Sequence, residues 1–177
     1  MDVIQIKDKQ FRLSIPSEKI HEAVEKVGYQ MNKDLSDKNP LFICVLNGAF
    51  MFASDLMKIV NIPCEITFVK LSSYEGLYTT GAVKEVIGLN ESVVGRTVVV
   101  VEDIVDTGIT MEKILNSLEA KGAKEIYVAT FLQKPEALQK DIKLDYIAMK
   151  IPNDFIVGYG LDYDGYGRNL KDIYTVI

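Results

Sequence analysis

Histidine, cysteine, arginine and tryptophan are scarce in this sequence. Its 177 residues contain one His, two Cys, three Arg and no Trp. Cys44 lies in an apolar run and Cys64 follows Pro63, so neither has the spacing of a disulfide framework or a zinc knuckle, and we expect two reduced thiols. The formal net charge of −5 argues against binding of nucleic acid through a basic surface, because neutralising phosphates requires clustered Lys and Arg. A small phosphorylated ligand needs only a few groups and stays possible.

Signals for secretion, membrane insertion or division into domains are also missing. The N-terminus lacks the basic start and apolar core of a secretion signal. The most apolar window, Leu41 to Val60, is interrupted by polar residues, so we expect no membrane span and a cytoplasmic protein. There is no repeat and no linker, and a chain of this length with 48% hydrophobic residues can bury one core. We therefore predict a single domain over residues 1–177.

Strand and helix patterns alternate along the chain. Ser17 is predicted to cap a helix whose apolar residues recur every three or four positions as far as Leu35, and further helices are predicted after Gly48 and over 111–118. Apolar runs predict strands over 41–46, 66–71, 98–101, 126–132 and 146–149. Residues 72–83 are polar and are predicted as a loop or lid. The alternation predicts an α/β fold with a mostly parallel sheet flanked by helices, in which ligands bind at the carboxyl ends of the strands.

Chemistry-bearing residues follow the strand over 98–101. Glu102 and Asp103 come first, and Asp106-Thr107-Gly108 with Thr110 follow where a helix is predicted to begin. Free N–H groups at a helix N-terminus bind phosphate, and glycine lets the backbone approach it closely. The two carboxylates cannot hold a phosphate, but they can accept hydrogen bonds from a diol or hold Mg²⁺. This turn therefore predicts a 5-phosphate site beside a ribose and metal site.

Other interpretations of the same turn fit less well. An isolated Asp106 would be interpreted as a helix cap. A helix cap alone does not explain the acid pair and Thr110, which stand in register with it. Aspartic proteases share Asp-Thr-Gly but are all-β, whereas a helix follows here. Phosphatases with a nucleophilic aspartate use two acids two residues apart, whereas Asp103 and Asp106 are three apart.

The turn resembles that of the type I phosphoribosyltransferases, and the chain from about Leu41 onward resembles their hypoxanthine/guanine branch. Segment 46–49 is similar to the pyrophosphate loop, and Ser73-Tyr74 is similar to the flexible loop that closes over the site. Lys134 matches the purine-contacting lysine, and segment 151–168 resembles the base-binding segment with its pyrophosphate arginine. The resemblance implies a central sheet flanked by helices with a small base-binding hood.

The resemblance also implies a reaction and its cofactor. A 5-phosphoribosyl group passes from phosphoribosyl pyrophosphate to N9 of hypoxanthine or guanine in purine salvage, giving IMP or GMP plus pyrophosphate, with Mg²⁺. The implied roles are these: Asp106 as base or partner of purine N7; Glu102, Asp103, Asp106, Thr107, Gly108 and Thr110 on the phosphoribosyl group; Asn47, Gly48 and Arg168 on pyrophosphate; Lys134, Phe155, Ile156 and Asp162 on the purine; and Glu102, Asp103 and Asp162 on the metal.

Two residues add a physical argument and one departs from the family pattern. Lys134 carries donors only, which favours a carbonyl at purine C6 over an amino group, and the planar fork of Arg168 suits phosphate oxygens. Many family members have Lys or Arg in place of Asn47, and in the family the peptide that enters this loop is often cis.

Several alternatives stay open. The activity could be that of a xanthine-preferring or pyrimidine transferase, or the chain could be a regulatory RNA-binding homologue with little turnover. His21 is predicted to be a structural or a surface residue, with no role in the site. A homo-oligomer, dimer or tetramer, is expected because such folds often self-associate. Four tyrosines fit either the core or a subunit interface: Tyr159, Tyr163, Tyr166 and Tyr174.

Overall fold

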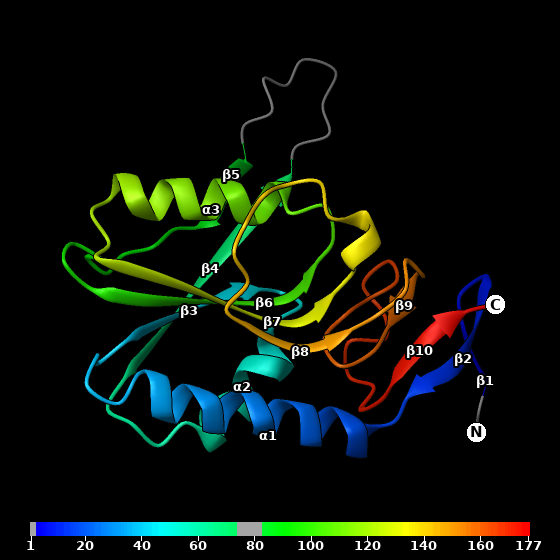
Figure 1. Cartoon of the computed structure of the whole chain (residues 1–177). Helices are drawn as coiled ribbons and strands as arrows, with labels where there is room; N and C mark the ends of the chain where they lie inside the picture. Colours follow the sequence, from blue (N-terminus) through cyan, green and yellow to red (C-terminus); the bar gives the residue numbers. More distant parts are fainter. Residues whose placement is uncertain (1–2, 74–82) are drawn as a thin grey trace.

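A six-stranded sheet forms the centre of the molecule, and a four-stranded sheet lies at one end of it (Figure 1). The computed structural model describes residues 3–73 and 83–177. The strands of the central sheet, in spatial order, are β5 (Val83–Ile87), β4 (Glu65–Ser73), β3 (Leu41–Leu46), β6 (Thr97–Val105), β7 (Glu125–Gln133) and β8 (Tyr146–Lys150). The five from β4 to β8 run parallel, and β5 is an antiparallel edge strand.

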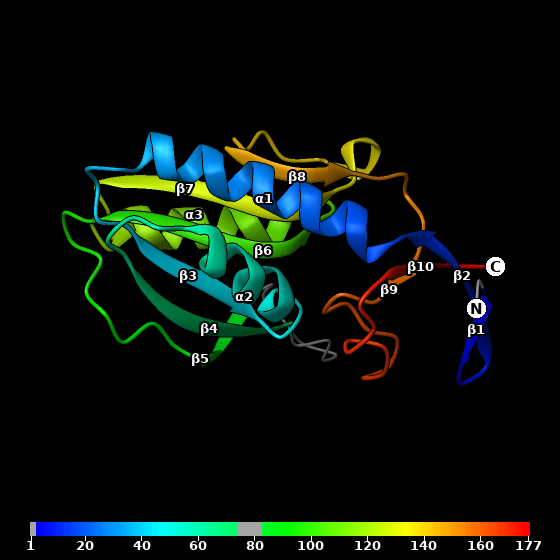
Figure 2. The same ribbon diagram turned by 90° about the horizontal axis from the view of Figure 1, so that it is seen from below.

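Helices cover both faces of the central sheet, as the sequence predicts. Helices α1 (Ser17–Asp34) and α2 (Phe50–Ile59) lie on one face, and α3 (Ile109–Ala120) lies on the other (Figures 1 and 2). A short 3₁₀ helix, η1 (Pro135–Ala137), follows β7. Each face has its own apolar cluster, so the middle strands are buried on both sides, which explains their continuous apolar runs. No helix in residues 3–73 and 83–177 is long and apolar enough to span a bilayer.

The second sheet, which we call the hood sheet, joins the two ends of the chain. It contains β1 (Val3–Ile6), β2 (Lys9–Ile15), β10 (Ile173–Val176) and β9 (Ile156–Val157) in that spatial order, all antiparallel. It lies beyond the carboxyl ends of β6 and β7 (Figure 1). Its N-terminal strands were not predicted from the sequence, although Phe11, Leu13 and Ile15 alternate with polar residues in the pattern of a half-buried strand.

Three local expectations are wrong. Ser17 is not a cap: Pro16 takes that position, and the Ser17 N–H donates to the Asp172 carboxylate at 2.7 Å, so a distant residue completes the helix end. The central strand does not end at residue 101 but continues as β6 to Val105, because pairing with β7 extends past the acid pair. The loop expected over 72–83 is wrong at both ends, because Ser72 and Ser73 of β4 pair with Lys84 and Val83 of β5; residues 74–82 lie outside the described residues.

Candidate active site

The predicted phosphate loop lies between the middle strand β6 and helix α3. Gly108 precedes the helix with φ of +84°, a left-handed conformation that glycine adopts without penalty. A cavity of about 100 Å³ is formed by this loop and the ends of the two elements. Predicted site residues that line the cavity are Glu102, Asp106, Thr107, Gly108 and Thr110. The structure therefore brings five of the six predicted phosphoribosyl contacts to one cavity at a helix N-terminus.

In the acid pair, Glu102 is buried and Asp103 is half-buried, near the carboxyl end of β6. The Asp103 N–H donates to Glu102 Oε1 at 3.1 Å, and the Ile104 N–H donates to Asp103 Oδ1 at 2.8 Å. Burial, and secondarily the charge of Asp103, raise the pKa of Glu102 well above its ordinary value. Burial also raises the pKa of Asp103, against the opposing effects of hydrogen bonds and of Arg168. The charge of Arg168 therefore compensates the charge of the pair only in part.

The predicted pyrophosphate loop packs directly against Asp103 of this acid pair. The Leu46–Asn47 peptide bond is cis, as the resemblance implied. A Cβ added to Gly48 would lie 1.6 Å from Asp103 Oδ2, so only glycine fits between the loop and the carboxylate. Cys44, on the strand that leads to this loop, is a buried free thiol, and burial followed by the two acids raises its pKa to about 12.

The C-terminal segment contacts the segment that contains Gly48. A Cβ on Gly160 would lie 2.0 Å from the Gly48 carbonyl oxygen, which places the two backbones in contact. Arg168 donates to the Gly160 carbonyl at 2.8 Å and pairs with Asp162 Oδ1 at 2.8 Å. Asp162 Oδ2 also accepts a hydrogen bond from the Gly165 N–H at 2.7 Å. Three segments that are remote in sequence therefore meet around the acid pair.

Of the predicted purine-binding residues, Lys134 directly follows β7, Phe155 directly precedes and Ile156 begins the hood strand β9, and Asp162 lies in the segment after β9. Lys134 is only 8% exposed, and its Nζ lies 3.6 Å from Asp106 Oδ2. Ile156 is buried in β9, whereas Phe155 is 47% exposed and packs against the rings of Phe11 and Tyr163. A large aromatic side chain half exposed at this position is not an ordinary core residue. Phe11, which was not predicted from the sequence, supports the Phe155 ring.

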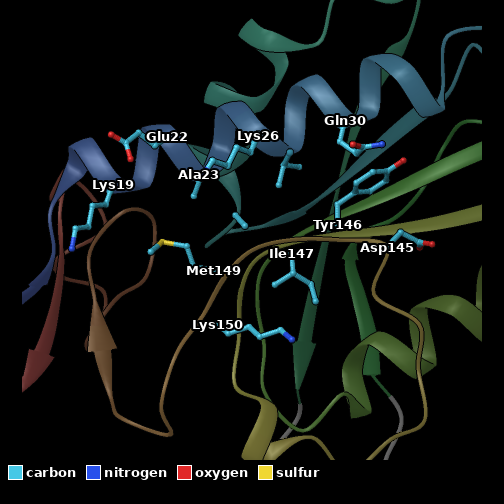
Figure 3. A pocket seen from close by; sticks show the side chains of 12 residues that line it. Lys19, Glu22, Ala23, Lys26, Gln30, Asp145, Tyr146, Ile147, Met149 and Lys150 are labelled. Carbon is cyan, nitrogen blue, oxygen red and sulfur yellow. The ribbon is translucent and has the colours of Figure 1, made fainter.

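Two predicted residues lie wholly or partly outside what the structure describes, and one large groove lies apart from the cavity over β6. Ser73 is the last residue of β4 and Tyr74 falls within 74–82, so the Ser73 side chain and the whole of Tyr74 lie outside what the structure describes. A groove of about 590 Å³ lies between α1 and β8 (Figure 3). It is lined by none of the predicted site residues, so the candidate site is the smaller cavity over β6.

Comparison with known proteins identifies the family. A profile described as the phosphoribosyl transferase domain matches residues 16–164. The chain belongs to the phosphoribosyltransferase family.

Relatives within the family match over most of the chain. The hypoxanthine-guanine phosphoribosyltransferase of Streptococcus thermophilus is 38% identical over 160 residues, which is 90% of this chain and 89% of that protein. The protein of the same description from Streptococcus pyogenes is 42% identical over 147 residues, 82% of each chain. A hypoxanthine phosphoribosyltransferase structure from Staphylococcus aureus has a TM-score of 0.88 at 33% identity, covering 99% of this chain and 92% of that one. The predicted fold, a helix-flanked parallel sheet with a hood, is confirmed.

The Mg²⁺ that the family resemblance implies fits the acid pair of this phosphoribosyltransferase. Glu102 and Asp103 offer hard oxygen ligands whose charge is only partly compensated, and Mg²⁺ typically takes one or two carboxylates together with substrate phosphates. Across the described ranges, no three acidic, histidine or cysteine side chains form a ready-made metal group. Asp162, the third predicted ligand, is paired with Arg168. Two carboxylates completed by substrate oxygens are the arrangement that this site can supply.

The acid pair predicts a gain of stability when one charge is removed. A carboxyl whose pKa is raised in the folded state destabilises the fold as pH increases from its unfolded pKa toward its folded pKa. Glu102→Gln should therefore raise the melting temperature at pH 8 without added metal, and the gain should shrink at pH 5. Differential scanning calorimetry measures both values. The exposed Glu119→Gln on α3 is the control, and a lower melting temperature for Glu102→Gln at pH 8 contradicts the prediction.

Proposed function

We propose that this phosphoribosyltransferase transfers the 5-phosphoribosyl group from phosphoribosyl pyrophosphate to N9 of hypoxanthine or guanine, giving IMP or GMP and pyrophosphate. The observation that carries the proposal is Lys134, a buried donor-only side chain beside Asp106 at the edge of the phosphate cavity. A 6-oxopurine offers this lysine an acceptor, whereas the amino group of adenine does not. The relatives that match most of the chain carry the hypoxanthine-guanine description.

The chemistry follows from the arrangement of charges around the cavity. In the proposed reaction N9 bonds to the anomeric carbon, the bond to pyrophosphate breaks, and the electron pair leaves with pyrophosphate. Sugar transfer of this type passes through an oxocarbenium-like state. Asp106 accepts the purine proton, the amides and hydroxyls of Thr107 to Thr110 hold the 5-phosphate, and Arg168 stabilises the leaving group. Glu102 and Asp103 would hold Mg²⁺, which when bound would supply further positive charge for pyrophosphate.

Three further parts of the proposal concern the protein as a whole. Residues 1–177 act as one domain, which is supported by the pairing of β2 with β10 at opposite ends of the chain. We also propose that the protein acts in the cytoplasm, in line with its free cysteines. Self-association into a dimer or tetramer stays a prediction, which sedimentation of the wild-type protein tests.

A base-selectivity assay tests the proposed substrate. Pyrophosphate release is measured with hypoxanthine, guanine, xanthine and adenine in parallel, under saturating phosphoribosyl pyrophosphate and Mg²⁺. Turnover with hypoxanthine or guanine is expected. Activity with adenine alone would overturn the argument from Lys134, and activity with xanthine alone would establish the alternative transferase. Salt-dependent RNA binding with negligible turnover would replace the enzyme by a regulatory protein.

Lys134→Ala should weaken the purine side of the reaction selectively. Loss of a charge-assisted hydrogen bond predicts a KM for hypoxanthine roughly tenfold higher or more. The KM for phosphoribosyl pyrophosphate should change little, and steady-state kinetics with each substrate varied in turn measures both. Lys124→Ala is the matched control, because Lys124 is exposed and directly precedes β7, whereas Lys134 directly follows it. Equal weakening of both substrates by Lys134→Ala would contradict the assignment.

A further inference from the structure

Tyr159 lies in an unusual backbone conformation beside the active site. It has φ of +45°, between Gly158 at +105° and Gly160 at +99°. Residues with a Cβ seldom adopt the left-handed region, because the Cβ crowds the following carbonyl, and bulky residues do so least. Tyr159 is nevertheless only 2% exposed. The surrounding structure must therefore hold this tyrosine in place, and backbone outliers of this kind cluster at functional sites.

The side chain of Tyr159 reaches helix α2. Its hydroxyl donates to Asp55 Oδ2 at 2.6 Å, and its ring lies against Phe131 with the ring centroids 4.7 Å apart. Asp55 also pairs with Lys58 at 2.9 Å, and His21 Nε2 lies 3.8 Å away. Burial opposes ionisation of Asp55, but the hydrogen bonds from Tyr159 and Lys58 outweigh it and lower the pKa of this carboxyl. Tyr159 therefore donates a charge-assisted hydrogen bond, which is stronger than a neutral one.

The hydrogen bond connects two segments that touch at the site. Helix α2 begins directly after the pyrophosphate loop that contains Gly48. Next to Tyr159, Gly160 contacts the Gly48 carbonyl, accepts from the Arg168 guanidinium at 2.8 Å and donates its N–H to the Arg168 carbonyl at 3.0 Å. The N–H of Tyr159 donates to the Leu170 carbonyl at 2.8 Å. Fixing the phenol against α2 thus fixes the register between the loop and the segment that carries Arg168.

We propose that Tyr159 and Asp55 are positioning residues whose hydrogen bond holds Arg168 and the pyrophosphate loop in their mutual arrangement. This inference rests on the proposed role of that loop and of Arg168 in binding pyrophosphate. Neither side chain touches the substrate in the proposal. Their effect is to orient the groups that do, and a small misplacement of such groups costs much of the rate or affinity.

The chain offers a second tyrosine–aspartate pair as a control. The Tyr146 hydroxyl donates to Asp34 Oδ2 at 3.0 Å, which joins β8 to α1 in the same manner. Tyr146 is 5% exposed and lines the groove between these elements (Figure 3). None of the predicted site residues lines this groove. Tyr159→Phe and Tyr146→Phe therefore each remove one tyrosine–aspartate hydrogen bond. The first hydrogen bond lies beside the site and the second lies away from it.

Steady-state kinetics and calorimetry on both variants test the proposal. Tyr159→Phe should raise the KM for phosphoribosyl pyrophosphate, and that for pyrophosphate in the reverse reaction, roughly tenfold. The KM for hypoxanthine should stay within about twofold of the wild-type value, because a difference of that size is expected even between sites that do not interact. Tyr146→Phe should lower the melting temperature comparably but leave every KM unchanged. An unchanged KM for phosphoribosyl pyrophosphate in Tyr159→Phe, or an equal increase in Tyr146→Phe, overturns the proposal.

A double-mutant cycle keeps the test decisive if one variant folds poorly. Asp55→Ala should reproduce the kinetic effect of Tyr159→Phe, and the double variant should be no worse than the worse single variant, because both changes remove one interaction. Additive effects would contradict a shared role. Arg168→Gln separates this inference from the proposed function. An unchanged KM for phosphoribosyl pyrophosphate in Arg168→Gln would contradict the pyrophosphate role itself. A large increase of that KM in Arg168→Gln with no change in Tyr159→Phe would contradict only the positioning role.

Discussion

Asp106→Asn is expected to lower kcat by roughly 10²-fold or more, the scale of a lost general base. The amide keeps the size of the side chain but can no longer accept the purine proton. The carboxylate lines the cavity over the phosphate loop, is half exposed and lies 3.6 Å from the ammonium of Lys134, a position that suits its proposed role as acceptor of the purine proton. Binding of phosphoribosyl pyrophosphate should weaken less than kcat falls. Pre-steady-state product formation and equilibrium titration measure the two quantities.

A control separates proton transfer from the loss of an ion pair. Glu125→Gln likewise replaces a lysine-paired carboxylate by an amide, but at the opposite end of β7, where Glu125 pairs with Lys38. It should leave kcat unchanged. Turnover at the wild-type rate in Asp106→Asn would remove this residue from the proton-transfer step, and an equal fall in both variants would point to a general loss of stability.

Gly48→Ala should reduce kcat/KM for phosphoribosyl pyrophosphate by roughly 10²-fold, the cost of displacing reacting groups by about an ångström. The added Cβ would lie 1.6 Å from Asp103 Oδ2, so the loop or the carboxylate must move. Either movement changes the distance between the pyrophosphate loop and the acid pair. Steady-state kinetics with phosphoribosyl pyrophosphate as the varied substrate measures the effect.

Gly28→Ala provides the matched control for this steric argument. A Cβ at Gly28, on α1, would lie 2.5 Å from the side chain of Ile59. This is also a steric clash, but it lies in the core and not at the site. This variant should lose stability and keep kcat/KM near the wild-type value. Unchanged kinetics in Gly48→Ala, with the fold intact, would show that the contact between loop and acid is not required for activity.

Local sequence patterns predicted the central sheet and the phosphate loop because both depend on neighbouring residues. The valines over 98–101 identify a buried strand, and the residues from Asp106 to Thr110 lie within one turn. The hood sheet could not be assembled from such patterns. Its strand β9 has two residues, and β2 pairs with β10 from the other end of the chain, so its stability comes from long-range pairing and packing around Phe11.

The sequence by itself determined which chemical groups this protein offers and their order along the chain: two adjacent acids, a phosphate-binding turn, a lysine after the next strand and an arginine near the end. Only the tertiary structure decided which of them meet. It placed Gly48 against Asp103, Gly160 against Gly48, and Tyr159 against Asp55. Contacts between segments separated by so many residues depend on how sheets and helices pack, and that packing is a property of the whole fold, because no local stretch contains both partners.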